Sequence, residues 1–156
     1  MTKNSNKSLA RYLCVQATYQ KILSKETFSE VLKQFSSHDG KDIFFNFENS
    51  FKKKNFEVDL NYFKKIIRNS DDNEKKIMEM IENNLSDKWQ IERLPILLNA
   101  ILISAVSEMI LSPKLSLGII ASEYILLTET FFLENESSFV NAVISNIYKS
   151  NQIHHE

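Results

Sequence analysis

Glycine and proline are scarce in this chain, and their scarcity constrains the fold more than any other feature of the sequence. Only two glycines and two prolines occur among 156 residues. Sheets joined by tight hairpins need glycine in their turns, and dinucleotide-binding folds need it in their phosphate loops. The sequence therefore predicts an all-α fold, in which helices are joined by polar loops. Its length suits one domain over residues 1–156 with a buried core.

The N-terminal segment shows clear helical spacing. Ser8 is predicted to cap a helix that runs to about Leu23. A stripe of mostly small residues recurs there at the period of a helix, and we expect it to be buried against another helix. Its members are Ala10, Leu13, Cys14, Ala17 and Thr18. Thr27 is predicted to cap a second helix.

The middle of the chain is harder to assign. Residues 41–57 could form a strand by propensity, but an isolated strand has no partner, so we expect a short helix or an ordered loop. Asp59 is predicted to cap the next helix. The apolar spacing from Tyr62 to Leu85 is interrupted by polar residues 69–73. We favour one long helix over two, because this break contains neither glycine nor proline.

The C-terminal half predicts three helices. Pro95 marks a helix start, and residues 96–111 are apolar almost all round, which is typical of a central helix surrounded by others. Residues 117–132 and 137–148 follow as the last two helices. We expect neither a membrane span nor a signal peptide. The lone Cys14 is consistent with a reducing cytoplasm.

Residues suited to catalysis are sparse. The cysteine and histidines are not spaced for a metal site, and no glycine-rich phosphate loop occurs, so we expect neither a metal nor a cofactor. Glu108 and Glu123 each lie in an apolar helix and could form an acid/base pair. Alternatively, each bonds a helix N-terminus, a neighbouring amide or an arginine such as Arg93. We favour the second interpretation because no nucleophile accompanies them, and we do not expect an enzyme.

Positive charge is concentrated at one end of the sequence. Residues 1–25 carry five cationic and no acidic side chains, whereas the net charge of the whole chain is −1. This pattern predicts either a local anion-binding surface or a solvated tail, and the charges alone favour neither.

Four blocks of sequence resemble one family. Residues 10–20, Ala-Arg-Tyr-Leu-Cys-Val-Gln-Ala-Thr-Tyr-Gln, are similar to the first helix of the bacterial transcription antitermination factor NusB family. Residues 93–108, with Arg-Leu-Pro, Ala-Ile-Leu and Ser-Glu in order, resemble its central helix. Residues 120–123 stand at a helix start of the family, and residues 139–144, Phe-Val-Asn-Ala-Val-Ile, resemble its Phe-Val-Asn signature. The blocks occur in the family's order.

The resemblance implies a bundle of about six or seven helices in two subdomains of three to four helices, at about residues 7–85 and 89–149. It implies an RNA-binding antitermination factor that binds boxA-type single-stranded RNA together with the ribosomal protein NusE. It also implies a place in RNA polymerase antitermination complexes, notably on ribosomal RNA operons. A homodimer is left open.

Seven residues are predicted to contact RNA from the resemblance and from the chemistry of single strands, which need cations for phosphates and flat side chains for bases. They are Lys3, Lys7, Arg11, Gln16, Tyr19, Phe139 and Asn141. Core packing remains an alternative for the two aromatic residues, and helix capping or bridging for the asparagine.

The chain also departs from the family's pattern. The N-terminal arginine run of the family is missing, and other cations usual in the family are replaced by Asn99, Ile103, Glu129, Thr130 and Ser138. Each lost cation removes a phosphate contact, so we expect weak RNA binding alone and tight binding only with the ribosomal protein. Two alternatives remain open: an RNA-binding domain related to ribosomal RNA cytosine methyltransferases, and a helical protein-interaction adaptor.

Overall fold

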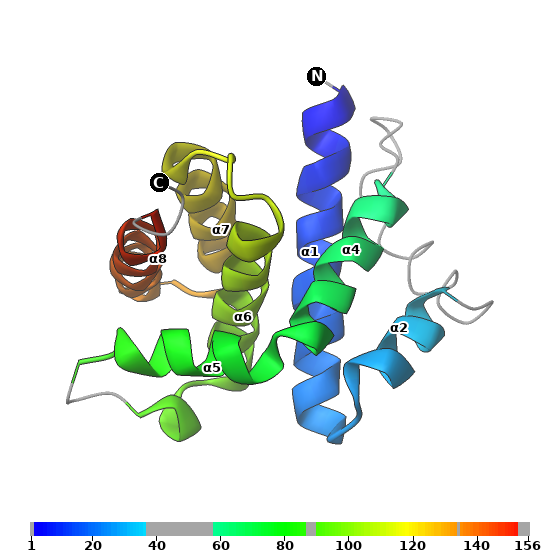
Figure 1. The fold of residues 1–156 in the computed structure, drawn as a ribbon, viewed down its shortest axis with the longest axis horizontal. Coiled ribbons are helices and arrows are strands. Elements are labelled where there is room, and N and C mark those ends of the chain that lie inside the picture. The colour runs from blue at the N-terminus through cyan, green and yellow to red at the C-terminus, as the bar shows by residue number, and fades with distance from the viewer. Residues whose placement is uncertain (1, 37–57, 87–89, 134, 153–156) are drawn as a thin grey trace.

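The computed structural model describes residues 2–36, 58–86, 90–133 and 135–152, and all regular structure within them is helical (Figure 1). The all-α prediction is confirmed. The elements are α1 (Thr2–Ser24), α2 (Phe28–Ser36), α4 (Leu60–Asp72), α5 (Glu74–Asn83), the 3₁₀ helix η2 (Ile91–Arg93), α6 (Ile96–Leu111), α7 (Leu117–Phe131) and α8 (Glu136–Gln152). No helix in these ranges combines the length and apolar content that a bilayer crossing requires.

Helix α6 is the central helix, as its apolar sequence predicts. It begins directly after Pro95, whose carbonyl accepts a hydrogen bond from the Asn99 amide at 3.0 Å. Helices α1, α4, α5, α7 and α8 all contact it, and Figure 1 shows it between α1 and α8. Every residue from Ala100 to Met109 is buried. Because α6 touches helices from both halves of the chain, it joins them into one core. The division into subdomains at about 7–85 and 89–149 stays a prediction.

Helix α1 is longer than expected. It begins at Thr2, so the prediction that Ser8 caps it is wrong. The extra turns are held against the start of α4, because the Asn6 carbonyl accepts a hydrogen bond from the Asp59 amide at 3.2 Å. Ser8 lies inside the helix, and its hydroxyl donates to Glu123 Oε1 at 2.7 Å. The stripe of small residues from Ala10 to Thr18 is buried, as predicted.

Two of the predicted helix caps are confirmed. The Thr27 hydroxyl accepts from the Glu30 amide at 3.1 Å, while the Glu30 carboxylate accepts from the Thr27 amide at 2.9 Å. This reciprocal pair is a capping box. Asp59 accepts from the Tyr62 amide at 3.0 Å and caps α4. Residues 41–57, for which we expect a short helix or a loop, lie outside the described residues.

The chain bends between α4 and α5, so the prediction of one continuous helix over this segment is wrong. Asn73 separates the two helices and has non-helical dihedral angles, φ −121° and ψ 24°. Its side-chain amide donates to Oδ1 of Asn69 at 2.9 Å, and the Asn69 amide donates to the Ser107 carbonyl of α6 at 2.8 Å. Asparagine side chains that bond nearby backbone compete with helix continuation. Figure 1 shows α5 leaving in a new direction.

The last two helices form a hairpin. The Ser116 hydroxyl caps α7 by accepting from the Ile119 amide at 3.2 Å. Helix α8 extends to Gln152, four residues beyond the predicted end at Tyr148. Its inner face buries Val140, Ile144 and Ile147.

Candidate nucleic-acid interface

A groove beside α1 contains two of the predicted RNA-contacting residues. Its volume is about 500 Å³. Gln16 and Tyr19 line it from α1, and they share the groove with residues from three other helices. The other lining residues are Gln20, Leu23, Phe35, Leu97 and Phe131. Tyr19 is 36% exposed, so part of its side chain remains available at the groove.

Gln16 gives this groove an unusual polar feature. Its side-chain oxygen Oε1 is buried and accepts no hydrogen bond from any residue that the structure describes. A buried acceptor without a donor costs free energy, on the order of 1–3 kcal/mol. A planar ligand with an N–H group could stack on Tyr19 and, once the Gln16 side chain turns toward the groove, donate to this oxygen. The groove therefore suits a flat, partly apolar group that carries a donor.

Lys7 lies apart from the groove. It is twelve positions before Tyr19 on α1, which corresponds to about 18 Å along a helix axis. Its ammonium group is 3.3 Å from Asp59 Oδ2 and 4.1 Å from the centre of the Tyr62 ring. Its side chain is 39% exposed, so one side of the charge still faces solvent. Lys3 lies in α1, but its side chain is outside the described part of the structure.

Arg11 does not take the place expected of a phosphate contact, and this prediction needs correcting. The residue is only 4% exposed. Its guanidinium group donates to both oxygens of Glu108, from Nε at 2.9 and 3.0 Å and from Nη2 at 2.8 Å. Nη1 is 3.1 Å from Glu123 Oε1. The planar guanidinium group of arginine fits such paired contacts to carboxylates. The positive charge of Arg11 is therefore paired with carboxylates inside the protein and does not face a phosphate.

Two tyrosines complete this buried cluster around Glu108. The hydroxyls of Tyr62 and Tyr124 donate to its carboxylate, the latter at 2.8 Å. Burial and the negative charge of Glu108 raise the pKa of Tyr62 to about 12 and that of Tyr124 well above its usual value. Burial alone would lower the pKa of Arg11, but the hydrogen bonds and charge of Glu108 outweigh it, and the pKa rises.

The buried cluster also decides between the two interpretations of Glu108 and Glu123. Both carboxylates are bonded, as favoured, but their partner is Arg11 of α1 and not Arg93, which is exposed. Within the described residues, no group of three metal-ligating side chains comes together. The arrangement ties α1 to α4, α6 and α7.

Phe139 and Asn141 are placed on α8. Phe139 is half-buried and packs against the core, which agrees with its packing alternative. Asn141 is exposed, and its Oδ1 accepts from the Ser145 hydroxyl at 3.5 Å. Neither residue belongs to the groove lining in the described structure.

Five of the seven residues that line the groove are not among the residues predicted to contact RNA. Leu23 follows Tyr19 by four positions and could have been found from helical spacing. Leu97 and Phe131 come from α6 and α7, and nothing in their local sequence separates a groove residue from a core residue.

The described residues thus form an all-helical protein with a groove that residues of four helices line. The sequence model of the NusB family matches residues 8–149. The chain belongs to the NusB family.

Curated relatives and solved structures agree with this assignment. The chain is 29% identical over 152 residues to the transcription antitermination protein NusB of Rickettsia massiliae (strain Mtu5), covering 94% of each chain. It is 29% identical over 157 residues to that of Rickettsia typhi (strain ATCC VR-144 / Wilmington), covering 96% of this chain and 95% of the relative.

Two solved structures share the fold. One is a crystal structure of a plectonemic RNA supercoil, whose matching chain has a TM-score of 0.67 at 25% identity, covering 92% of this chain and 94% of that chain. The other is a crystal structure of antitermination factors NusB and NusE in complex with dsRNA. Its TM-score is 0.67 at 24% identity, with 92% of this chain and 96% of that chain covered.

Proposed function

We propose that this protein is an RNA-binding transcription antitermination factor. It binds boxA-type RNA together with the ribosomal protein NusE and supports transcription of ribosomal RNA operons in complexes with RNA polymerase. Membership of the NusB family over residues 8–149 supports this function. So does similarity, over nearly the whole chain, to relatives named as antitermination proteins. It acts as a binding protein and not as an enzyme, and it works in the cytoplasm.

The groove at Tyr19 is the observation that carries the RNA-binding proposal. One unstacked base lies on the Tyr19 ring, and its exocyclic amine donates to Gln16 Oε1, which turns toward the groove when RNA binds; both side chains line this groove. Recognition of single strands uses such stacking and base-edge hydrogen bonds. Lys7 and Lys3 contact phosphates at the other end of α1. On α8, Asn141 and the exposed part of the Phe139 ring form a further contact.

Replacement of Tyr19 tests the groove. Tyr19→Ala should weaken binding of boxA-type RNA by roughly 5- to 150-fold, because one stacked base contributes about 1–3 kcal/mol. Tyr19→Phe keeps the ring and should retain most of the affinity. Leu126→Ala is the matched control, since Leu126 is exposed on α7 and does not line the groove. Equal affinity of Tyr19→Ala and the unaltered protein would exclude stacking at this position.

The ribosomal protein's contribution is tested separately. The few cations at the family's usual positions predict weak binding by this chain alone and tight binding with NusE. RNA affinity should be measured across a salt titration with and without the ribosomal protein. Equal affinities would contradict cooperative binding, and no binding in either case would contradict the RNA function itself.

A further inference from the structure

Helix α4 carries a cluster of three cationic side chains that do not line the groove, and Asp71 and Asp72 follow this cluster at the end of the helix. Lys64, Lys65 and Arg68 are spaced so that Arg68 follows the two lysines by four and three positions, which places all three side chains on neighbouring parts of one face. The opposite face of α4 buries Phe63, Ile66 and Ile67 among others. The helix is therefore amphipathic, with an apolar inner face and a cationic outer face.

The three cations lack ion-pair partners within the described residues. The pairs found there involve Lys7, Arg11 and Lys21 instead. Asp59, the acidic residue that caps α4, accepts a hydrogen bond from Lys7. Lys65 interacts with it only through its positive charge at longer range, which helps to lower the pKa of Asp59. Acidic side chains appear on α4 only at its end. These three positive charges are thus available to an anionic ligand.

The composition of this surface favours a phosphate backbone over a protein partner. The hot spots of protein interfaces are enriched in Trp, Tyr and Arg around an apolar centre. The only strongly exposed large apolar residue on the described part of α4 is Leu60, at the first position of the helix. Lysine and arginine suit phosphates, which are contacted without reading bases. The neighbouring Tyr62 is half-buried, and its hydroxyl is bonded to Glu108.

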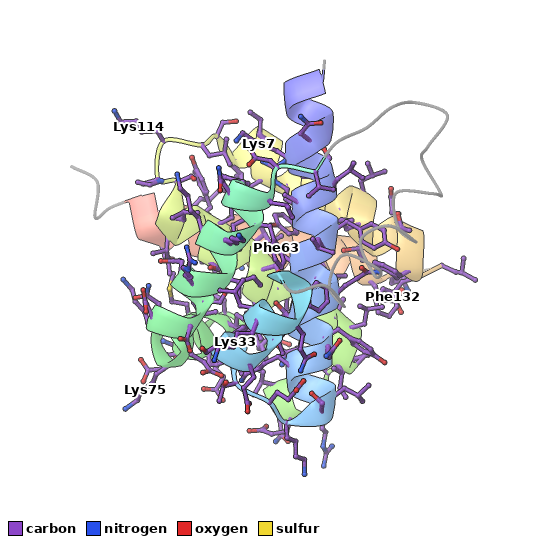
Figure 2. All side chains as sticks on the ribbon, turned by 90° about the vertical axis from the view of Figure 1, so that its right-hand side faces the viewer. Lys7, Lys33, Phe63, Lys75, Lys114 and Phe132 are labelled. Carbon is purple, nitrogen blue, oxygen red and sulfur yellow. The ribbon has the colours of Figure 1, made fainter. Side chains whose placement is uncertain are left out.

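The groove and this surface lie on either side of α2. Phe35 of α2 lines the groove, and its ring also packs against that of Phe63 on α4, with centroids 5.9 Å apart. Packed helices are separated by about 8–10 Å, so a single strand can pass from one site to the other. Figure 2 shows α2 and α4 facing the viewer together, with Lys33 of α2 on this side. Lys33 is exposed and adds a cation along the path.

We propose that Lys64, Lys65 and Arg68 form a second RNA site, which binds the phosphate backbone of the segment next to the base held in the groove. This inference rests on the proposed RNA-binding function. Contacts of this kind raise affinity for any sequence and position the strand. They also supply, from a different helix, cations that this chain lacks at the family's usual positions.

The test compares two triple variants with the same net charge. Lys64→Gln/Lys65→Gln/Arg68→Gln removes the proposed site. Lys25→Gln/Lys114→Gln/Lys149→Gln is the matched control, because these lysines are exposed and lie on other parts of the surface. Each variant changes the formal charge from −1 to −4. Glutamine has nearly the helix propensity of lysine and arginine, and urea unfolding checks that both variants are folded.

The measurement is RNA affinity across a salt series, with NusE present. Two single-stranded boxA-type RNAs are used, one of about 6 nucleotides that fills the groove and one of about 25 nucleotides that also reaches α4. For the long RNA, losing three phosphate contacts should reduce the slope of log affinity against log salt by about 2. A fourfold increase in salt should then weaken RNA binding by both proteins, and the loss should be about 20-fold greater for the unaltered protein than for the α4 variant. The short RNA should bind both equally.

Three results would overturn the proposal. The α4 variant could match the unaltered protein on the long RNA, or both triple variants could lose affinity equally, which would indicate a general charge effect. The α4 variant could instead lose binding of NusE while its RNA affinity alone is unchanged, which would make α4 a protein-binding surface. If the unaltered protein binds neither RNA, the proposed function itself fails. If Tyr19→Ala loses binding of the short RNA while the α4 variant binds the long RNA normally, the groove remains supported and only the α4 site is excluded.

Discussion

Arg11 illustrates how one side chain can belong to a recognisable motif and still have an unexpected role. Its spacing from Lys7 on α1 suggests a shared outward face, yet its guanidinium group lies between the carboxylates of Glu108 and Glu123. Buried ions are tolerated only when all their hydrogen-bonding groups are satisfied. Here two tyrosine hydroxyls satisfy the remaining acceptor capacity of Glu108.

Removing the central carboxylate should therefore be costly. Glu108→Gln should lower the free energy of unfolding by about 3 kcal/mol, because it leaves a buried guanidinium group without its main counter-charge. Urea denaturation at neutral pH measures this loss. Glu129→Gln, at an exposed position on α7, is the control and should change stability by less than about 0.5 kcal/mol.

A second measurement isolates the Arg11–Glu108 pair. Arg11→Met combined with Glu108→Leu should destabilise the protein by less than the sum of the two single changes, because neither partner is then left charged and buried. Additive losses would show that the pair contributes nothing beyond the packing of each side chain.

At the level of whole elements, helix starts depend on local chemistry and were largely predictable. Thr27, Asp59 and Pro95 each precede a helix in the structure. The features that were missed depend on contacts distant in sequence. The first turns of α1 are supported by the start of α4, and the bend at Asn73 is tied through Asn69 to α6. No local pattern contains that information.

The cap at Asp59 gives a prediction about acid stability. Hydrogen bonding to the Tyr62 amide, helped by Lys7, lowers the pKa of Asp59. The pKa of Asp59 is lower in the folded protein than in the unfolded chain, where it is near 4. The ionised carboxylate therefore stabilises the fold at pH values above about 4, and this stabilisation is lost as the pH falls through the folded pKa. Asp59→Ala should cost about 1 kcal/mol at neutral pH, measured by urea unfolding.

Asp59→Asn separates the cap from the charge. Asparagine also accepts from the Tyr62 amide, so stability at neutral pH should fall less than in Asp59→Ala. The variant should lose the part of the acid dependence below about pH 4 that comes from this group. Identical acid unfolding curves for Asp59→Asn and the unaltered protein would contradict the assignment.

For the molecule as a whole, the class of fold follows from the sequence, whereas the candidate site follows only in part. Two glycines and two prolines with helical periodicity are sufficient to predict an all-α protein. The groove requires the packing of four helices, and only Gln16 and Tyr19 of its lining were predicted. Phe35 and Leu97 have the same apolar character as core residues, so only the three-dimensional structure shows that they line a groove.

The groove predicts a conflict between stability and binding. Gln16→Leu removes a buried acceptor without a donor and should raise the free energy of unfolding by about 1 kcal/mol. The same change should weaken RNA binding, because the base loses its hydrogen bond. Gln20→Leu is the contrasting variant, since Gln20 already bonds Gln34 and Glu26, and it should lose stability. A loss of stability in Gln16→Leu would mean that its oxygen is satisfied.

The enclosure of α6 by other helices determines how its backbone amides exchange with solvent. Every amide from Ala100 to Met109 is covered by surrounding helices. Amides in such positions exchange with deuterium only when the whole protein unfolds, whereas frayed ends exchange through local opening. The slowest-exchanging protons should thus fall in α6, and their rates should report global stability with and without bound RNA.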